Sequence, residues 1–401
     1  MNILFICDEY PPQQNGGIGT FVQLLAEKLA TKGHKVIVYG LTDINEGVQQ
    51  AVTIAGNVTI IRNYYSVKVP DSISSGFVRR ILLRVFAFFS LFFWKKKYHD
   101  KINSLIQKHN IDILETPDWD SKVIKNPFFD FLPSKVTCPV IVRLHGSHSF
   151  FQSEKKATIN KLIFKKEKGL YQSSDGTINI SRYAQKVYNN CYPNIFNDTI
   201  VIPNGVSKAE LINKRKVKES YDFVFFGTLT KKKGIFSLAK AWNIVCEVDD
   251  HHQLHIYGKG DKKKVQQLLS KRALEQTIFH GHVNRATLLS HLQTYDIAVL
   301  PSYSETFGLA AIEAMNAGLA TIFTEWTTGP EIISHNVDGL LVDPSSGDDI
   351  AEKITFLLNH PKDCLALAEK GKEKVKLFTA ENTADQTIDF FQTIIKKYSL
   401  E

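Results

Sequence analysis

Residues 301–318, PSYSETFGLAAIEAMNAG, follow a short apolar run that is typical of a buried strand. The pattern predicts a strand-to-helix loop that carries Glu305, then an apolar helix that begins near Gly308 and stops at Gly318. The free N–H groups and the positive dipole end of such a helix favour a bound anion. Glu313, about one and a half turns into the helix, has a side chain that leans back toward the helix N-terminus. An anion site beside two carboxylates suits a sugar nucleotide, whose diphosphate would bind the amides and whose hydroxyl groups would bind the carboxylates.

The size and composition of the chain predict a folded protein of two domains. The 401 residues are too many for one ordinary core, and 43% hydrophobic with 22% charged residues is typical of globular proteins. The net charge of +8 favours anionic partners, namely nucleotide sugars, anionic lipid surfaces or nucleic acid. Five scattered cysteines form no C-x-x-C pair, and the N-terminus lacks the basic n-region of a signal peptide. We therefore expect a cytoplasmic protein without a disulfide framework or a zinc site.

Strand and helix patterns alternate along the chain, which predicts an α/β fold with parallel sheets covered on both faces. A strand at 3–7, a helix at 20–31 and a strand at 35–39 form a βαβ unit of the doubly wound type. The alternation resumes after the polar, lysine-rich stretch 207–220, which we interpret as the linker between the domains. In such sheets ligands bind outside the carboxyl ends of the strands.

Two further strand ends carry residues suited to a phosphorylated sugar. Gly16 and Gly17 follow the first strand, and without a Cβ they let backbone N–H groups approach an anion. A lone glycine pair forms a simple tight turn in about half of such cases, and its place after the first strand favours the functional interpretation. His145 ends the strand predicted at 140–144, where its imidazole can donate to a hexose hydroxyl or to a leaving phosphate. A buried structural histidine is the alternative.

The segment 77–98, FVRRILLRVFAFFSLFFWKKKY, would form a helix that is largely apolar apart from a narrow stripe of polar or small residues. Its charge-free core of about ten residues is too short to cross a bilayer, which needs about 20. Its arginines and the Lys95–Lys97 end suit a helix that lies in an anionic membrane interface, at the inner face of the cell membrane. A helix packed in the core or between domains, with a solvated basic end, is an equal alternative.

The stretch ETFGLAAIEAM, residues 305–315, resembles the E-x7-E signature of retaining glycosyltransferases of family 4, which have the GT-B fold. Further motifs of that family occur in the same order over nearly the whole chain. They are NGGIG (15–19), RLHG (143–146), IPNGV (202–206), FFGTLTKKKG (225–234), TTGPEII (327–333) and DGLLVDP (338–344). The resemblance implies two doubly wound, Rossmann-like domains that face each other across a cleft. It places an acceptor-side domain at 1–206, a nucleotide-sugar domain at 220–379, and a last helix at about 380–401 that packs back on the first domain.

The resemblance also implies a function. A hexosyl unit would pass, with retained anomeric configuration, from a UDP- or GDP-linked sugar to a glycan or lipid-linked saccharide, in the synthesis of cell-surface polysaccharide or glycolipid. Catalysis would fall to His145 and Glu305, and ribose binding to Glu313. The residues assigned to the donor are Gly16, Gly17, Gly227, Thr228, Lys232, Lys233, Phe307, Gly308, Leu309 and Glu313.

The charge of the diphosphate would rest on lysine in this chain, because Thr228 stands where the family often has arginine. Lysine binds phosphate as a point charge, without the fork of arginine. We expect this cationic loop to make a metal unnecessary. No cofactor is therefore predicted, and activity should survive EDTA.

An acidic loop follows the strand predicted at 111–115. Asp118-Trp119-Asp120 has the D-x-D spacing that holds a metal in another glycosyltransferase fold, but no further ligand cluster accompanies it. We interpret the loop as acceptor-side and predict no metal site. Glu115 or Asp118 is the candidate acid/base group, and Trp119 and His148 are further acceptor-side candidates.

Three other function classes are alternatives. A GT-B-fold epimerase or phosphorylase is the first alternative, although no lysine motif for pyridoxal phosphate is present; product analysis with a labelled donor separates these. A nucleic-acid-binding protein is suggested only by the net charge, since the lysines occur in short runs without interleaved stacking aromatics. An NAD-dependent oxidoreductase would need the G-x-G-x-x-G fingerprint, which is not matched.

Overall fold

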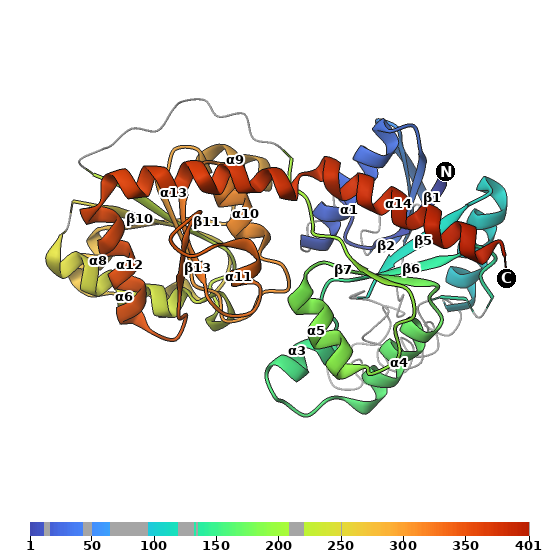
Figure 1. Cartoon of the computed structure of the whole chain (residues 1–401), viewed down its shortest axis with the longest axis horizontal. Helices are drawn as coiled ribbons and strands as arrows, with labels where there is room; N and C mark the ends of the chain where they lie inside the picture. Colours follow the sequence, from blue (N-terminus) through green and yellow to red (C-terminus); the bar gives the residue numbers. More distant parts are fainter. Residues whose placement is uncertain are drawn as a thin grey trace, which may run out of the picture. The chain divides into compact units, whose positions relative to one another are not determined.

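The computed structural model of the chain describes most of its residues. They are 1–11, 17–42, 50–64, 95–118, 132–133, 135–207, 220–249 and 251–400. The chain folds into two compact units, each of which has its own sheet (Figure 1). Unit 1 consists of Met1–Ile180, Ala184–Ile202 and Thr383–Glu401, and unit 2 of Ser181–Tyr183 and Pro203–Asn382.

The sheet of unit 1 has the strand order β3-β4-β2-β1-β5-β6-β7-β8. All neighbouring pairs are parallel except β3 with β4, which form an antiparallel edge. The strands are β1 (Asn2–Ile6), β2 (Lys35–Thr42), β3 (Gln50–Ala55), β4 (Val58–Tyr64), β5 (Ile113–Pro117), β6 (Val140–Leu144), β7 (Gly176–Asn179) and β8 (Thr199–Val201). Apart from β3, the order is that of a doubly wound fold, with the topological switch between β1 and β5.

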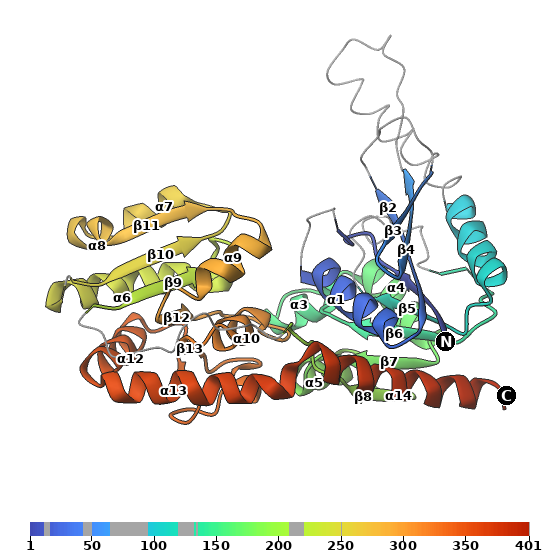
Figure 2. The same cartoon turned by 90° about the horizontal axis from the view of Figure 1, so that it is seen from above.

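The helices of unit 1 pack around a core that joins both ends of the chain. They are α1 (Gly17–Thr31), a helix at 95–109, α3 (His148–Glu154), α4 (Lys161–Gln172), α5 (Arg182–Cys191) and α14 (Ala380–Tyr398). Phe391 of α14 and Ile3 of β1 belong to the same buried cluster. In Figures 1 and 2, α14 lies beside β7, where a Cβ on Gly176 would be 3.0 Å from Phe390. The last helix therefore completes the core of unit 1.

The sheet of unit 2 is entirely parallel, with the order β11-β10-β9-β12-β13-β14, which Figure 2 shows from above. Its strands are β9 (Asp222–Phe226), β10 (Gln253–Tyr257), β11 (Thr277–Gly281), β12 (Ile297–Leu300), β13 (Ala320–Thr324) and β14 (Leu340–Val342). This is the doubly wound order 3-2-1-4-5-6, with the switch between β9 and β12. Every residue of β12 and β13 is buried, because both faces of the sheet are covered.

The helices of unit 2 follow its strands in regular alternation. They are η1 (Lys231–Lys233, a 3₁₀ turn), α6 (Ile235–Val248), α7 (Lys262–Leu268), α8 (Lys271–Glu275), α9 (Arg285–Leu292), α10 (Leu309–Asn316), α11 (Gly329–Ile332), α12 (Gly347–Asn359), α13 (Pro361–Lys374) and η2 (Val375–Phe378). The core includes the fully buried Trp242 of α6, whose ring contacts Phe223 of β9 edge-on at 5.2 Å. The predicted α/β class, with two doubly wound parallel sheets, is confirmed.

The basic apolar segment 77–98 is described only at its end, since residues 77–94 lie outside the described ones. Tyr98 is 1% exposed, and its ring stacks on Tyr39 of β2 at 5.5 Å between centroids. This end of the segment thus packs into the core of unit 1, while Lys96 and Lys97 are exposed. Membrane contact through the rest of the segment stays a prediction.

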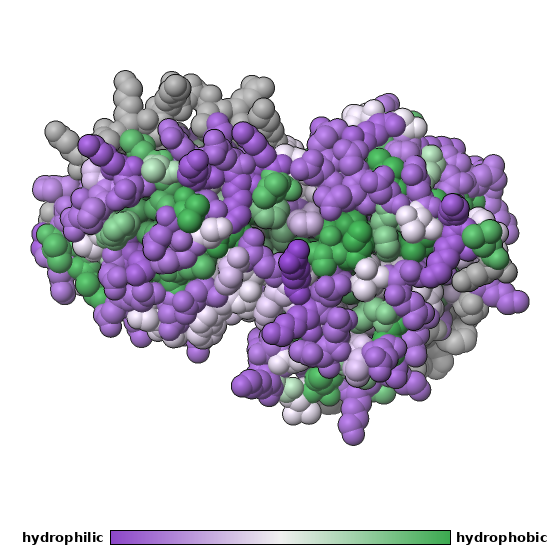
Figure 3. All heavy atoms as spheres, in the orientation of Figure 1, coloured by the Kyte–Doolittle hydropathy of each residue, from purple (hydrophilic) through white to green (hydrophobic). Residues whose placement is uncertain are grey.

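The described surface is mainly hydrophilic on the face drawn in Figure 3, where hydrophobic residues form small groups separated by polar ones. In the described part of the chain, no helix combines the length and the apolar character that crossing a bilayer requires.

Candidate functional site

The switch point of unit 2 brings a lysine and a carboxylate together. Lys233 belongs to η1, which follows β9, and Glu305 lies in the loop that follows β12. Lys233 Nζ is 2.6 Å from Glu305 Oε1, and the two side chains are 28% and 11% exposed. The carboxyl ends of the two strands at a topological switch are where doubly wound sheets bind ligands. The pair therefore lies where sheets of this type bind ligands, and the side chain of Lys233 is partly exposed.

Glycine holds this lysine turn close to the neighbouring strand end. Gly234 has φ 75°, and an added Cβ would lie 1.8 Å from the carbonyl oxygen of Pro301, so only glycine fits there. The carbonyl of Lys232 accepts a hydrogen bond from Tyr303 N–H at 2.8 Å. These contacts fix η1 against the loop that carries Glu305. The aliphatic stem of Lys233 runs over Gly227. A Cβ added to Gly227 would lie 3.7 Å from Cγ of Lys233.

Helix α10 begins after Gly308, whose φ of 91° lies in the left-handed region, and no side chain caps it there. An added Cβ on Gly308 would lie 2.7 Å from Ile332, so a larger residue would clash. Glu313 is 8% exposed, and its Oε1 is 2.5 Å from a guanidinium nitrogen of Arg285. Burial raises the pKa of Glu313, and the charge of Arg285 opposes that rise. The carboxylate is thus desolvated and lies beside one partly exposed cation.

Arg285 was not predicted as a site residue. It is the first residue of α9, where a positive charge opposes the positive end of the helix dipole. That unfavourable position is a signal in the sequence that its guanidinium has another partner. The partner, Glu313, is 28 positions further along the chain, and only the folded sheet shows which carboxylate it meets.

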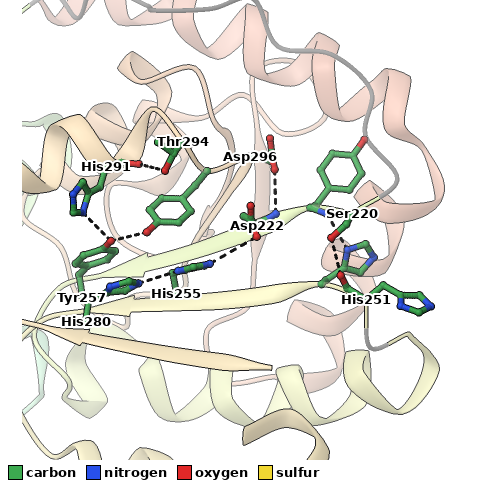
Figure 4. A network of polar contacts seen from close by, with 12 residues as sticks. Ser220, Asp222, His251, His255, Tyr257, His280, His291, Thr294 and Asp296 are labelled. Carbon is green, nitrogen blue, oxygen red and sulfur yellow. Dashed lines mark hydrogen bonds and ion pairs between the residues drawn. The ribbon is translucent and has the colours of Figure 1, made fainter. Parts of the chain in front are cut away.

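A network of aromatic and histidine side chains fixes α9 on the sheet (Figure 4). Tyr257 of β10 shares hydrogen bonds with His291 of α9 at 3.0 Å and with Tyr295 at 2.5 Å. The ring of His280, on β11, stacks on Tyr257 at 4.3 Å and contacts His255 through a 2.9 Å N···N hydrogen bond. Helix α9 is thereby anchored at one end while Arg285 at its other end holds Glu313.

The other residues predicted to bind the donor have mixed surroundings. Thr228 is exposed, and its hydroxyl is 3.4 Å from that of Thr230. Leu309 is half-buried at the start of α10. The ring of Phe307 is 5% exposed and packs edge-on against Phe378, with 6.0 Å between centroids. Core packing therefore accounts for Phe307, and its geometry does not support the predicted donor contact.

In unit 1, His145 follows β6 with its imidazole in a buried, apolar setting. The residue is 8% exposed, and its ring meets Phe21 edge-on at 5.4 Å. Its Nε2 is buried and has no hydrogen-bond partner among the described residues. Burial, and then the charge of Arg143, lower the pKa of His145 to about 3. The imidazole is therefore neutral near pH 7.

The burial of His145 predicts a pH dependence of stability. Because its pKa is about 3 in the folded protein and ordinarily 6.5, the unfolded chain takes up the proton first as pH falls. This group then destabilises the fold below pH 6.5, by at most about 1.4 kcal/mol per pH unit. Between pH 7 and pH 5, the melting temperature of the wild type should fall relative to that of His145→Gln. Parallel melting temperatures across this range would contradict the assignment.

Asp118 follows β5 and is fully buried beside His145. Its Oδ1 accepts a hydrogen bond from His145 N–H at 2.9 Å, and its Oδ2 accepts one from the hydroxyl of Tyr188. Burial raises the pKa of Asp118 to about 7, although the bonds from Tyr188 and from the His145 amide lower it. With a folded-state pKa above the ordinary 3.8, Asp118 adds stability as pH falls from 7 toward 4, the direction opposite to that of His145.

Glu115 has a different place from the acceptor-facing one that we predicted. It is 2% exposed on β5 and accepts two hydrogen bonds from Arg143 of β6, at 2.8 and 2.9 Å. Arg143 also donates to the hydroxyl of Thr387 of α14, at 3.2 Å. A buried ion pair with both carboxylate oxygens occupied ties the strands to the last helix. The geometry gives no support to an acid/base role for Glu115.

The remaining predicted residues of unit 1 are only partly described. Gly17 begins α1 and is exposed, and no atom of the described residues lies within 4 Å of a Cβ added there. His148 begins α3 and is half-buried. Gly16 and Trp119 lie outside the described residues. Within the described residues, no group of three or more histidine, cysteine or acidic side chains is arranged to hold a metal ion.

Both halves of the chain match families of known proteins. Residues 207–374 match the family described as Glycosyl transferases group 1, and residues 15–210 match Glycosyltransferase Family 4. A glycosyltransferase of Methanocaldococcus jannaschii, itself uncharacterized, is 31% identical over 62% of this chain and 67% of its own length.

Solved structures with the same architecture include a sucrose-phosphate synthase and a protein with bound UDP. Sucrose-phosphate synthase of Thermosynechococcus elongatus has a TM-score of 0.76 at 19% identity, covering 99% of both chains. The Anabaena protein HepE, solved with UDP and glucose, has a TM-score of 0.68 at 16% identity, covering 98% of this chain and 100% of its own. These likenesses show the GT-B fold. Together with the family matches, they establish that the chain belongs to glycosyltransferase family 4 and is a glycosyltransferase.

Proposed function

We propose that unit 2 binds a nucleotide-diphosphate hexose at the carboxyl ends of β9 and β12. The observation that carries the proposal is the meeting of Lys233 and Glu305 at the switch point, with Glu313 on the helix that follows. Lys233 and the N-terminus of α10 would bind the diphosphate, since cations and free amides favour phosphate. Glu313 would accept hydrogen bonds from the ribose, and Glu305 from the hexose. The UDP bound to the structurally similar HepE agrees with a nucleotide donor.

The main catalytic role of these residues would be to stabilise the leaving diphosphate. As the bond between the anomeric carbon and the diphosphate oxygen breaks, negative charge develops on that oxygen, and Lys233 lies where it can offset it. The acceptor hydroxyl forms the new bond on the same face of the sugar, and its proton passes to the departing phosphate oxygen. Configuration at the anomeric carbon is then retained, and no protein nucleophile is needed.

We assign the acceptor to unit 1 and a hydrogen bond to the transferring sugar to His145. Its neutral imidazole has a buried ring nitrogen without a partner among the described residues, which is a costly state unless a ligand completes it. A glycan or lipid-linked saccharide is the acceptor class, and Asp118 and His148 are its candidate neighbours. Cell-surface polysaccharide or glycolipid synthesis is the role that we infer from this acceptor class.

Donor turnover in the absence of acceptor tests the proposal. The purified protein is incubated with UDP-glucose, UDP-galactose, UDP-N-acetylglucosamine or GDP-mannose in buffer that contains EDTA, and released nucleoside diphosphate is measured. We expect slow release from one donor, unaffected by EDTA, with the retained anomer of the free sugar appearing first by NMR. Release that requires a divalent metal, or first appearance of the inverted anomer, would contradict the proposed chemistry.

A further inference from the structure

The backbone that follows His145 is held by side chains at every residue from 145 to 150. His145 N–H donates to Asp118 Oδ1 at 2.9 Å. The next two amides, of Gly146 and Ser147, donate to one phenol oxygen, that of Tyr188, at 3.0 and 2.8 Å. The same phenol donates its own proton to Asp118 Oδ2. One tyrosine and one carboxylate thus fix three successive peptide units.

The second half of this loop is held in the same way by another carboxylate. The amides of His148 and Ser149 donate to Glu167 Oε1 at 2.8 and 3.3 Å, and Phe150 N–H donates to Ser147 Oγ at 3.2 Å. Tyr192 O–H donates to Glu167 Oε2 at 2.6 Å. The amides at the start of α3 are therefore satisfied within the protein, so this helix end is not the anion site of unit 1.

The hydrogen bonds that fix His145 lie in a dry environment. Asp118 and Tyr188 are each 0% exposed, and the ring of Tyr188 contacts Phe150 at 4.9 Å and Tyr192 at 6.5 Å. Buried hydrogen bonds of this kind are costly to lose, because no water replaces the missing partner. The backbone is therefore held at the point where the imidazole leaves the chain, and the ring itself packs edge-on against Phe21 at 5.4 Å.

We propose that Tyr188 is a positioning residue for catalysis: through Asp118 and the amides of Gly146 and Ser147, it sets the orientation of His145. The inference rests on the proposed role of His145 and extends it to a residue that no motif in the sequence singled out. Tyr188 itself contacts no substrate. It acts by keeping the imidazole in the geometry that the transferring sugar requires, since a displacement of about 1 Å can cost about 100-fold in rate.

Two tyrosines four residues apart allow a matched comparison. Tyr188 lies on α5 and Tyr192 directly follows it, and Tyr188→Phe and Tyr192→Phe each remove one buried hydroxyl bonded to a buried carboxylate. Both variants should melt at lower temperature than the wild type, Tyr188→Phe by more, because its phenol also accepts hydrogen bonds from two buried amides. Only Tyr188→Phe should lower kcat, by about 10- to 100-fold, with the donor KM changed less than about twofold. Equal kcat values for the two variants would overturn the proposal.

A double-mutant cycle with His145→Ala separates this inference from the proposed function. His145→Ala should lower kcat, and Tyr188→Phe added to it should lower kcat no further, because the imidazole that it positions is gone. If Tyr188→Phe lowers kcat in the His145→Ala background by the same factor as in the wild type, the positioning role is wrong while the role of His145 stands. If His145→Ala leaves kcat unchanged, the proposed role of His145 fails, and the positioning role fails with it.

Discussion

Replacing Glu313 by glutamine is expected to lower kcat/KM for the donor by about 100-fold or more, since hydrogen bonds to a charged acceptor contribute about 1.5–3 kcal/mol each. The amide keeps the volume of the side chain but offers one neutral acceptor in place of two charged ones. Burial raises the pKa of Glu313 above its ordinary value, with Arg285 opposing the rise. As pH falls, the wild type should therefore begin to lose donor affinity at a higher pH than it would with an ordinary glutamate. The glutamine variant should not show this pH-dependent loss.

A second buried carboxylate of unit 2 serves as the control for Glu313. Asp338 is 3.0 Å from Lys374 Nζ and accepts a hydrogen bond from Ser334 N–H at 2.7 Å, so Asp338→Asn also disrupts a buried ion pair. Both variants should melt at lower temperature than the wild type, but Asp338→Asn should keep kcat/KM within about twofold. Steady-state kinetics with the active donor measures the difference. If Glu313→Gln keeps the kcat/KM of the wild type, Glu313 does not contribute to donor binding.

Replacing Lys233 by methionine should nearly abolish transfer, with kcat falling about 100-fold or more. The methionine keeps an apolar stem over Gly227 but removes the ammonium that offsets charge on the leaving diphosphate. It also leaves Glu305, 9% exposed, without the cation that lies 2.6 Å from it in the wild type. An unpaired carboxylate at that position would repel the diphosphate, so both effects act in the same direction.

Lys231 is the matched control, because it belongs to the same 3₁₀ turn. Its Nζ lies over the ring of Tyr303, 5.8 Å from the centroid, rather than beside Glu305. Lys231→Met removes the same charge from the same turn and should change kcat less than about threefold. Pre-steady-state measurement of nucleoside diphosphate release compares the two variants. Similar losses in both would show that η1 acts only through its total charge, which contradicts the specific role of Lys233.

Much of the fold follows from the sequence because alternating apolar strands and helices leave few arrangements for a chain of this length. The parallel sheets and their strand-end loops were predictable from this alternation. The edge strand β3 was not predicted. It pairs antiparallel with β4 through a turn at Gly56, and an exposed edge strand lacks the continuous apolar run that marks a buried one.

The side-chain pairings of the site were less predictable than its strands. Lys233 and Glu305 are 72 residues apart. Arg285 and Glu313 lie on helices that follow β11 and β12, two strands that are separated in the sheet by β10 and β9. The pair of Glu115 and Arg143 did carry a signal, since each is a charged residue in an otherwise apolar strand. When adjacent buried strands carry opposite charges, the two side chains are expected to form an ion pair. The role of Tyr188 had no such signal, because a tyrosine on an amphipathic helix is ordinary.

The measurement that addresses the central claim most directly is calorimetric titration of UDP and GDP, in buffer with EDTA, into the wild type, Lys233→Met and Glu313→Gln. If the carboxyl ends of β9 and β12 bind the nucleotide diphosphate, the wild type binds one of the two without metal, and each variant binds it at least about 10-fold more weakly, which is a loss of about 1.4 kcal/mol. Equal dissociation constants for all three proteins would contradict the account.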